Sequence, residues 1–584
     1  MLKRQFILGI SCYYHDAAAC LIKDGKIIAA AEEERFTRLK HDTSFPINAI
    51  NYCLKEAGIK GKDLDYVGFY EKPLLKFERL LSQHLEMFPK SFWSFYKALP
   101  SWINEKLRVP STIRKKLGYK GDILFVEHHM AHAASSYLVS PFKKAAILTV
   151  DGIGEWTTTT FGYANGNEIV LEKEIHFPHS LGLLYSTVTA HLGFKVNDHE
   201  YKVMGLAPYG KPAYYEKFKK LVKVNDDGSY RLDMRYFVYH YKLSMPSRKF
   251  IKEFGPVRKR EEKVEQRHKD IAASLQKITE EILFKLANNL YKMTKMDNLC
   301  VAGGVALNSV ANGKILRNTP FKKVYIQAAA GDAGTSLGVA FYIYNTILGK
   351  KRVYVMDNCY HGPHFSTSEI KNYLDKNEIK YSQFKDDNEL AKETAMLIFE
   401  NNVIGWFQGR MEWGPRALGS RSILSNACNP EMKDILNLKV KHREQFRPFA
   451  PVVSVEDTYD YFEADKPLPI PADFMLMVYP IKKSRRKLLP AVTHVDGSGR
   501  LQTVSKSQNS RYYAVIKEFE KLSGAPILIN TSFNIRGEPI VCNPENAYRC
   551  MMGTGIDYLV MDRFLIARKD NPQHMWDSEK TIND

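Results

Sequence analysis

Cysteine is scarce in this sequence, and long apolar runs are missing. Eight cysteines occur among 584 residues and none forms a C-x-x-C pair, which favours reduced thiols and a cytoplasmic location. No stretch approaches the roughly 18 apolar residues that a membrane-spanning helix needs, so we expect no membrane partner. The apolar run Phe6–Cys12 is cut short by His15 and Asp16, and no small-residue cleavage site follows, unlike in a signal peptide.

Acidic residues are outnumbered by basic ones, 65 Asp and Glu against 84 Lys and Arg, which gives a net charge of +19. This excess is compatible with a nucleic-acid partner, with small anionic substrates such as nucleotides and acyl phosphates, or with a lysine-rich solvated surface. Charge alone does not choose among them. The length indicates two or three domains, and a hydrophobic content of 45% indicates an ordered globular protein.

Two histidines, His128 and His132, lie four residues apart and would project from the same face of a helix. Two apolar runs further along the chain, Ala145–Val150 and Val324–Ala330, each lead into an Asp at the mouth of a strand. Two imidazoles with one or two carboxylates favour Fe(II), Mn(II) or Zn(II) over Mg or Ca. The sequence therefore predicts a metal site formed by His128, His132, Asp151 and Asp332.

A strand–turn–strand unit occurs twice, offset by about 140 residues. The first copy comprises the strands Phe6–Cys12, Ala17–Lys23 and Lys26–Ala31, and the second comprises Ile147–Val150, Thr157–Tyr163 and Glu168–Leu171. Such a duplication, with a polar loop after each first strand, resembles the way in which the actin and sugar-kinase superfamily grips nucleotide phosphates. We therefore expect an α/β fold with a duplicated actin-like (ribonuclease H-like) N-terminal domain.

Two glycine loops follow strands later in this domain. An amphipathic helix is predicted over Arg267–Met293, followed by a buried strand, Asn298–Ala302. Paired glycines after a strand let the backbone approach a ligand and offer N–H groups to it. Two such loops at the ends of consecutive strands favour a nucleotide cleft over packing turns; they contain Gly303, Gly304 and Asn308, and Gly331 and Gly334.

Two insertions carry no motif. The aromatic-rich stretch from Tyr70 to Tyr119 forms either a helical core or a lid that recognises the acceptor. The basic stretch from Lys211 to Glu262 is expected to pack on the outside of the first domain.

A second domain is predicted from about residue 350. Three polar stretches there interleave arginine with Gly and Pro: Gln408–Ser422, Lys439–Pro448 and Asn530–Pro539. Guanidinium groups held on turns suit polyphosphate and acyl-phosphate oxygens. An RNA surface would use similar residues, but with exposed aromatic side chains between the charges, so small anions are favoured.

The segments Met411–Ser422, Asn530–Asn534 and Glu200–Gly210 resemble motifs of the NodU/CmcH family of O-carbamoyltransferases, and the resemblance runs in order from Gly9 to near the C-terminus. It implies an actin-like metal- and nucleotide-binding carbamoyl-transfer domain over residues 1–352. It also implies a C-terminal YrdC-like α/β domain, which forms carbamoyl-adenylate, over residues 353–584.

The resemblance also implies a two-step reaction. The second domain would make carbamoyl-adenylate from carbamoyl phosphate and ATP with Mg²⁺, using Arg416, Lys441, Arg447, Arg500 and Ser532. The first domain would transfer the carbamoyl group to a hydroxyl of a small metabolite, such as an antibiotic or nodulation factor, with Fe²⁺ as the expected metal and His15 as the base. The nucleotide and donor would be bound by Lys40, Gly152, Gly303, Gly304, Asn308, Gly331, Gly334, Arg421, Arg443, Asn530 and Asn534.

Other functions remain open. The basic charge and the related metal-binding domain allow a tRNA-modifying, threonylcarbamoyl-transfer-like or RNA-binding protein, although nucleic acid is the less favoured partner. A sugar kinase would leave the arginine-rich second domain unexplained. A homo-oligomer is compatible with the sequence, and the acceptor is not determined by it.

Overall fold

The chain divides into two compact units in a computed structural model that describes residues 4–571. The first unit comprises the chain up to Glu33 and the range Thr43–Met356. The second comprises Glu34–Asp42 and the chain from Asp357 onward. In this division the main boundary falls between residues 356 and 357, and a short N-terminal segment belongs to the second unit.

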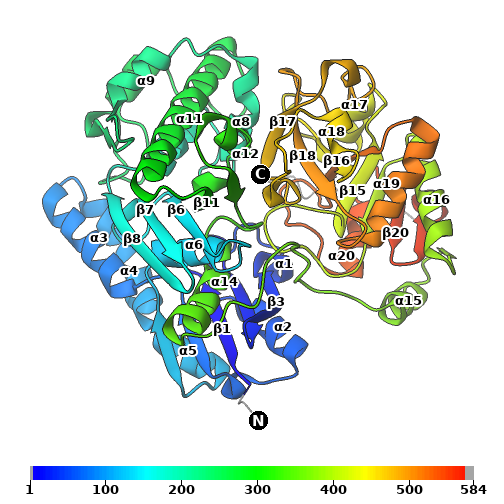
Figure 1. Ribbon diagram of the computed structural model, residues 1–584, viewed down its shortest axis with the longest axis horizontal. Coiled ribbons are helices and arrows are strands. Elements are labelled where there is room, and N and C mark those ends of the chain that lie inside the picture. Colours follow the sequence, from blue (N-terminus) through cyan, green and yellow to red (C-terminus); the bar gives the residue numbers. More distant parts are fainter. Residues whose placement is uncertain (1–3, 572–584) are drawn as a thin grey trace. The chain divides into compact units, whose positions relative to one another are not determined.

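The first unit contains two five-stranded sheets with the same strand order (Figure 1). The first sheet, ordered β3-β2-β1-β4-β5, consists of β1 (Phe6–Ser11), β2 (Ala18–Lys23), β3 (Lys26–Glu32), β4 (Tyr66–Phe69) and β5 (Asp122–Phe125). The second, ordered β8-β7-β6-β11-β12, consists of β6 (Lys144–Val150), β7 (Thr157–Asn165), β8 (Glu168–His176), β11 (Asn298–Ala302) and β12 (Lys323–Tyr325). In each, the first three strands in sequence pair antiparallel and the last two join in parallel. This topology confirms the predicted α/β class and its duplicated actin-like arrangement.

The first hairpin turn shows how local sequence sets the register of these strands. Asp24 and Gly25 both have positive φ, 50° and 77°. This is the backbone that a two-residue turn of the tightest hairpin type requires, and Gly adopts it without steric cost. The turn aligns β2 with β3, so that Ala18–Leu21 stay fully buried.

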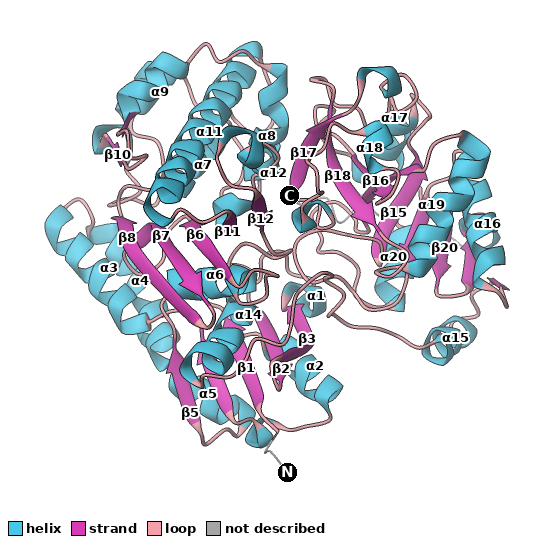
Figure 2. Cartoon of the chain, in the orientation of Figure 1, coloured by secondary structure: helices cyan, strands magenta, loops and turns pink. Residues whose placement is uncertain are grey.

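The helices of the first unit lie between and beside these strands (Figure 2). They are α2 (Ile47–Ala57), α3 (Pro73–Met87), α4 (Phe92–Asn104), α5 (Val109–Leu117), α6 (His128–Tyr137), α7 (Leu181–His191), α8 (Glu200–Leu206), α9 (Tyr215–Leu221), α10 (Arg248–Phe254), α11 (Gln266–Thr294), α12 (Ser309–Asn312), α13 (Ile315–Asn318) and α14 (Ala333–Phe341). The insertion after residue 210 contributes α9, α10 and the hairpin of β9 (Val222–Val224) and β10 (Tyr230–Leu232).

Helix α14 packs unusually closely against its neighbours because two glycines remove side chains from the contact. A Cβ added to Gly9 on β1 would lie 1.8 Å from the carbonyl oxygen of Ser336. A Cβ added to Gly338 on α14 would lie 2.0 Å from the carbonyl oxygen of Ala131 on α6. These close approaches hold α14 against β1 and α6, and both predicted metal-ligand histidines lie on α6.

Replacing Gly338 by Ala should therefore destabilise the first unit. The methyl group would collide with the backbone of α6, and overpacking of this kind costs about 1–3 kcal/mol. Urea denaturation of the two proteins measures the difference. Gly152→Ala is the control, since an added Cβ there meets no atom within 4 Å; equal losses in both variants would contradict the packing argument.

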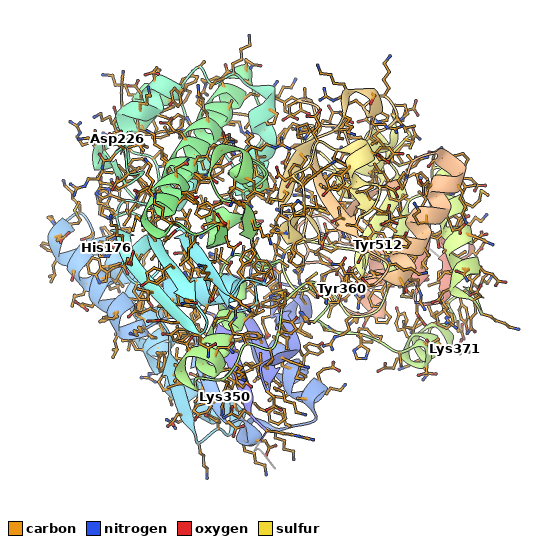
Figure 3. All side chains as sticks on the ribbon, in the orientation of Figure 1. His176, Asp226, Lys350, Tyr360, Lys371 and Tyr512 are labelled. Carbon is orange, nitrogen blue, oxygen red and sulfur yellow. The ribbon has the colours of Figure 1, made fainter. Side chains whose placement is uncertain are left out.

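The second unit is built on one nine-stranded sheet of order β13-β21-β20-β14-β15-β19-β16-β18-β17. Its strands are β13 (Ser382–Gln383), β14 (Ile404–Phe407), β15 (Arg421–Asn426), β16 (Ala450–Ser454), β17 (Met477–Pro480), β18 (Ser498–Val504), β19 (Ile527–Ser532), β20 (Tyr558–Met561) and β21 (Phe564–Ala567). Its helices are α1 (Glu34–Thr37), α15 (Thr367–Lys376), α16 (Asp387–Phe399), α17 (Met432–Leu436), α18 (Thr458–Tyr461), α19 (Ser510–Ser523) and α20 (Pro544–Met552). The core between the sheet, α16 and α19 includes the fully buried Trp406 and Tyr512, the latter labelled in Figure 3.

The N-terminal segment Glu34–Asp42 is tied to the second unit by arginine side chains. Arg35 donates from its guanidinium to the carbonyl of Gly414 at 2.9 Å. Arg38 donates to the carbonyls of Ile540 at 2.7 Å and Pro539 at 2.6 Å. The segment therefore completes the second unit although it lies more than 300 residues earlier in the chain.

One predicted strand is wrong in extent. The apolar run Val324–Ala330 was expected to be a strand with Asp332 at its mouth, but β12 ends at Tyr325. The residues from Ala328 to Asp332 form a turn, and Asp332 directly precedes α14. Alanine has low strand propensity, which explains why the three alanines leave the sheet.

The aromatic insertion is helical, but only part of it is core. Trp102 on α4 is 5% exposed, whereas Trp93 and Tyr96 on the same helix are 69% and 62% exposed. The stretch is therefore helical, as expected, but its exposed aromatic side chains do not belong to a buried core.

Among residues 4–571, no helix is both long and apolar enough to cross a membrane.

Candidate functional site

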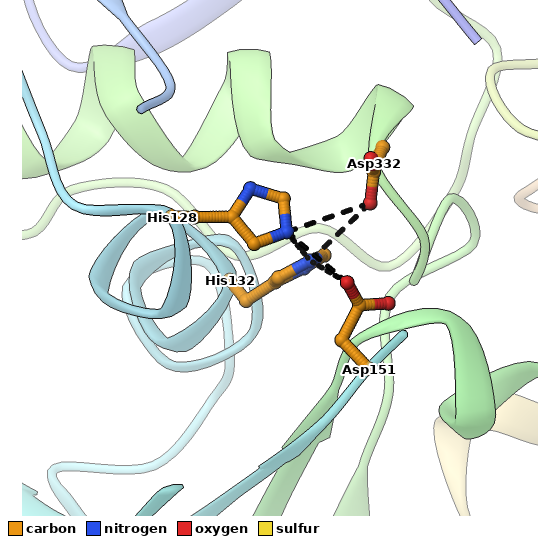
Figure 4. A group of neighbouring side chains, drawn as sticks. All are labelled: His128, His132, Asp151 and Asp332. Atoms are coloured by element: carbon orange, nitrogen blue, oxygen red, sulfur yellow. Dashed lines mark hydrogen bonds and ion pairs between the residues drawn. The ribbon is translucent and has the colours of Figure 1, made fainter. Parts of the chain in front are cut away.

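Four side chains of the first unit converge on one point (Figure 4). His128 and His132 come from the first turns of α6, Asp151 from the end of β6 and Asp332 from the start of α14. The Nε2 atoms of the two histidines lie 3.1 Å apart, and that of His128 lies 3.2 Å from Asp151 Oδ2. His132 Nε2 lies 3.5 Å from Asp332 Oδ1. One ligand atom from each residue falls within 4.8 Å of all the others.

The polar atoms at this point fit a bound cation. All four residues are at most 5% exposed, yet within residues 4–571 neither carboxylate oxygen of Asp332 accepts a hydrogen bond. A buried carboxylate without a donor carries a large desolvation cost unless a cation compensates it. The two Nε2 atoms likewise face one position, where each could bind a cation. Imidazole nitrogens and carboxylate oxygens suit Fe(II), Mn(II) or Zn(II), and these contacts do not distinguish the three.

The electrostatics of the cluster keep its carboxylates charged. Burial alone would raise the pKa of Asp151, but the neighbouring imidazoles of His128 and His132 outweigh burial and hold that pKa well below its usual range. Burial would lower the pKa of His128, whereas Asp332 and Asp151 raise it further than burial lowers it. His129, between the two histidines, faces away and pairs with Thr149 Oγ1 at 2.6 Å.

Two contacts orient the ligands from outside the cluster. The backbone N–H of Gly304 donates to Asp151 Oδ1 at 2.7 Å, which leaves Oδ2 directed at the histidines. Glu155 accepts from the backbone N–H of His128 at 3.1 Å and so caps the start of α6. The sequence analysis did not find Glu155. Its partner lies 27 positions earlier, so no local pattern could have identified it.

His15, the predicted base, lies beside this cluster. Its Nδ1 is 2.9 Å from Asp16 Oδ2 and its Nε2 is 3.7 Å from Asp332 Oδ2. Burial lowers its pKa, but Asp332 and Asp16 outweigh burial and raise the pKa to about 9. A cation at Asp332 would oppose this rise, because it would neutralise the carboxylate that causes it.

The predicted glycines have two different roles. A Cβ at Gly152 meets nothing within 4 Å, and one at Gly331 meets only a Leu307 methyl at 3.7 Å, so both positions leave room for a ligand. By contrast, a Cβ at Gly303 would lie 2.3 Å from the carbonyl oxygen of Val150, and one at Gly334 would lie 2.0 Å from that of Ala329. These two glycines are required by backbone packing.

Asn308, also predicted to bind nucleotide, makes contacts within the protein. Its Oδ1 caps α12 by accepting from the N–H of Ala311 at 3.1 Å, and its side chain pairs with Gln276. The structure thus gives Asn308 a positioning role at the end of the glycine loop.

A second polar cluster lies in the second unit around Lys441. This lysine is 6% exposed and sits at the end of a wide helical turn after α17. Its Nζ donates to the carbonyl of Ser532, and to the carbonyl and Oδ1 of Asn534 at 3.3 and 3.0 Å. Asn534 Oδ1 also accepts from Ser532 Oγ at 2.6 Å. The structure therefore brings together three residues that lie up to 93 positions apart.

Two arginines add positive charge to this cluster. Burial lowers the pKa of Lys441, and the cations of Arg443 and Arg447 lower it further, to about 7. Arg443 stacks over the ring of Phe449, with its Cζ 4.0 Å from the ring centre. A buried amine beside two guanidinium groups, with only neutral acceptors as its own partners, is suited to binding a polyanion.

Arg421 and Asn530 were predicted as nucleotide ligands, but the structure assigns their side chains to the scaffold. Arg421 is fully buried and donates to the carbonyls of Gln408 at 2.7 Å and Pro363 at 3.0 Å. Asn530 is 1% exposed and donates to the carbonyl of Ala417 at 3.0 Å. Both side chains are used to fold the loop that precedes β15.

Glu412 organises the same loop and was not singled out by the sequence analysis. Its Oε1 accepts from the backbone N–H groups of Leu418, Ser420 and Arg421, at 2.7, 2.7 and 3.1 Å. A single carboxylate oxygen that gathers three amides fixes the loop that carries Arg416.

For the remaining predicted residues, the structure gives a position in the fold but no role. Arg416 lies in the loop between β14 and β15, Arg500 lies on β18, and Lys40 lies in the Glu34–Asp42 segment of the second unit. All three are partly exposed. Their roles toward nucleotide or donor stay predictions.

Comparison with known proteins gives the family. Residues 6–341 match the model of the carbamoyltransferase N-terminus, and residues 395–568 match that of the carbamoyltransferase C-terminus. The nodulation protein NolNO of Sinorhizobium fredii is 37% identical over 97% of this chain and 80% of its own. An uncharacterized protein of Synechocystis, sll1178, is 48% identical over 98% of both chains.

A remote likeness to solved structures is illustrated by one of them. The crystal structure of HypF from T. kodakarensis aligns at 15% identity with a TM-score of 0.33, covering 59% of this chain and 48% of that one. A likeness at this level adds nothing to the assignment. The two family models cover most of the chain, in both units, and on their match the chain belongs to the carbamoyltransferase family.

Proposed function

We propose that this carbamoyltransferase is an ATP-dependent O-carbamoyltransferase whose two units catalyse successive steps. The second unit joins a carbamoyl group to AMP, and the first unit transfers that group to a hydroxyl of a small metabolite. The observation that carries the proposal is that each unit holds its own charged cluster: two histidines and two aspartates in the first, and the Lys441 cluster in the second.

The Lys441 cluster supports the first step. Carbamoyl phosphate, ATP and water would give carbamoyl-adenylate, phosphate and pyrophosphate, with Mg²⁺ bound to the nucleotide. Lys441, Arg443 and Arg447 would hold phosphate oxygens, since ammonium and guanidinium groups in a buried site stabilise negative charge that develops there. Ser532 and Asn534 keep the lysine directed to this position through the contacts described above. The YrdC-like character of this unit belongs to the same proposal.

The histidine–aspartate cluster supports the second step. A divalent metal held by His128, His132, Asp151 and Asp332 would supply a Lewis acid for the carbamoyl group. Fe²⁺ is the expected ion, and Mn²⁺ or Zn²⁺ also suits these ligands. His15, 3.7 Å from Asp332, would accept the proton of the acceptor hydroxyl as the new carbamate ester forms and AMP leaves. Gly152 and Gly331 leave space for donor and acceptor beside these residues.

The acceptor is a hydroxylated small molecule. Relatives of this chain are named as nodulation proteins, NolNO and NolO, at 37% and 36% identity. This likeness supports a natural product of comparable kind, and antibiotics and other hydroxylated metabolites fit the same chemistry.

Pyrophosphate release tests the proposal directly. Purified protein with ATP, Mg²⁺ and carbamoyl phosphate, but no acceptor, should release pyrophosphate, and omission of carbamoyl phosphate should abolish the release. ADP in place of pyrophosphate would indicate phosphoryl transfer and overturn the proposal. Retention of RNA with a steep salt dependence, and no nucleotide turnover, would instead support the nucleic-acid reading.

A further inference from the structure

A cluster of basic side chains next to the metal centre is unused by the proposed chemistry. It consists of Lys76 and Arg79 on α3 and Lys106 in the short turn after α4. Lys76 is 4% exposed and forms an ion pair with Glu71. No ion pair or hydrogen bond joins the side chain of Lys106 to any residue in the range 4–571, and its Nζ lies 4.8 Å from the ring centre of Trp102.

Arg79 is the unusual member of this basic cluster. The residue is 8% exposed, yet within the described range its guanidinium makes no hydrogen bond or ion pair, and its buried Nε has no acceptor. Its Cζ lies 5.2 Å from the centre of the Phe177 ring. A buried unpaired guanidinium is costly, and such groups are normally bound to carboxylates or phosphates.

Within residues 4–571, Arg79 and Lys106 have no carboxylate at ion-pair distance. Glu71 is already paired with Lys76, and Glu155 is occupied by backbone N–H groups of α6 and Lys72. Burial lowers the pKa of Lys106, and the nearby cation of Lys76 lowers it further, to about 8, although Glu71 and Glu105 raise it. Three carboxylates thus lie near the three cations: Glu71 is paired with Lys76, Glu155 caps a helix, and Glu105 acts on Lys106 without forming an ion pair with it.

Tyr14 links the basic cluster to the metal centre. Lys76 Nζ lies 5.2 Å from the centre of the Tyr14 ring, whose centre lies 4.6 Å from that of His15. His15 in turn lies 3.7 Å from Asp332. A group bound by the cluster would therefore sit near the reacting atoms but not on them.

We propose that Arg79, with Lys76 and Lys106, binds an anionic group, a phosphate or a carboxylate, of a substrate held at the metal centre. Two substrates could carry that group: the acceptor, as a substituent remote from its reacting hydroxyl, or the adenylate donor. The assignment of the anion to a substrate rests on the proposed carbamoyl transfer, whereas the binding of an anion does not. Arg79 fixes the substrate and is a specificity-determining residue, because binding energy at a remote group positions the reacting one.

The test measures phosphate binding to the full-length, metal-loaded protein by thermal shift. Lys441→Met is introduced in every sample so that phosphate binding to the Lys441 cluster of the second unit does not contribute to the measured shift. Inorganic phosphate should raise the melting temperature of this parent protein in a saturable way. Adding Arg79→Met should increase the phosphate concentration needed for half of this effect at least tenfold. The control is Arg235→Met, since Arg235 is exposed and paired with Asp233.

A second readout separates binding from a structural role. Without phosphate, Arg79→Met should melt at the same or a higher temperature than the parent, because it removes an unpaired buried charge. A lower melting temperature, or phosphate stabilisation equal to that of the parent, would overturn the proposal.

AMP distinguishes the two sources of the anion. If the group belongs to the donor, Arg79→Met weakens AMP binding as much as phosphate binding. If it belongs to the acceptor, AMP affinity is unchanged and phosphate still binds to the AMP-saturated parent. Both results support the anion site, and neither depends on whether pyrophosphate is released in the assay of the proposed function.

Discussion

His132→Ala should remove the bound metal and lower carbamoyl transfer by at least about 1000-fold, while pyrophosphate release continues at the wild-type rate. The imidazole is fully buried, and its Nε2 faces both His128 and Asp332. Alanine leaves three ligands and an empty space that no other side chain fills. Metal content by mass spectrometry and the two partial reactions, assayed separately, give the result.

His129→Gln is the matched control for this variant. His129 lies on the same helix and is also buried, but it pairs with Thr149 and not with the cluster. Its substitution should cost stability and leave metal content intact. Loss of pyrophosphate release in a folded His132→Ala protein would contradict the division of the reaction between the two units.

Lys441→Met should lower pyrophosphate release at least about 100-fold and leave metal content unchanged. The methionine fills a similar space but cannot donate to phosphate or to the oxygens of Ser532 and Asn534. Lys439→Met is the control, because Lys439 lies two residues earlier in the chain and its Nζ forms an ion pair with Asp557 Oδ1 at 3.0 Å. Equal losses in both variants would remove Lys441 from its proposed role.

The same lysine makes nucleotide binding depend on pH. Since burial and two arginines hold its pKa near 7 in the folded protein, below that of the unfolded chain, the amine loses its proton as pH rises through 7. ATP binds the protonated form, so its dissociation constant should increase up to about tenfold per pH unit above 7. In Lys441→Met this slope should vanish; calorimetric titrations at pH 6.5, 7.5 and 8.5 measure it.

Much of the first unit follows from local pattern. The strand Asn298–Ala302 was predicted with its observed bounds, and the helix over Arg267–Met293 differs from α11 by one residue at each end. Strong periodicity and clear turn residues explain both. The prediction of a strand over Val324–Ala330 was wrong in extent, because an apolar run that ends in three alanines does not by itself distinguish a strand from a turn.

The histidine–aspartate cluster could be predicted because its ligands follow simple rules: a four-residue spacing on a helix and acidic residues after apolar runs. The roles of Arg421 and Glu155 could not. Whether an arginine binds phosphate or backbone carbonyls depends on which loops surround it, and those loops come from distant parts of the chain. Spacing identifies side chains that can act together, while tertiary packing decides which donors are still available.

The segment Glu34–Asp42 has a consequence for how the protein can be made and divided. The polypeptide enters the second unit at residue 34, returns to the first at residue 43 and leaves it again after residue 356. No single cut separates the two units. A gene fragment that starts at Asp357 would lack the arginines that bond to the carbonyls of Gly414 and Ile540. During synthesis these arginines are translated early, whereas the carbonyls that they bond to are translated several hundred residues later. The second unit can therefore be completed only after most of the chain has been made.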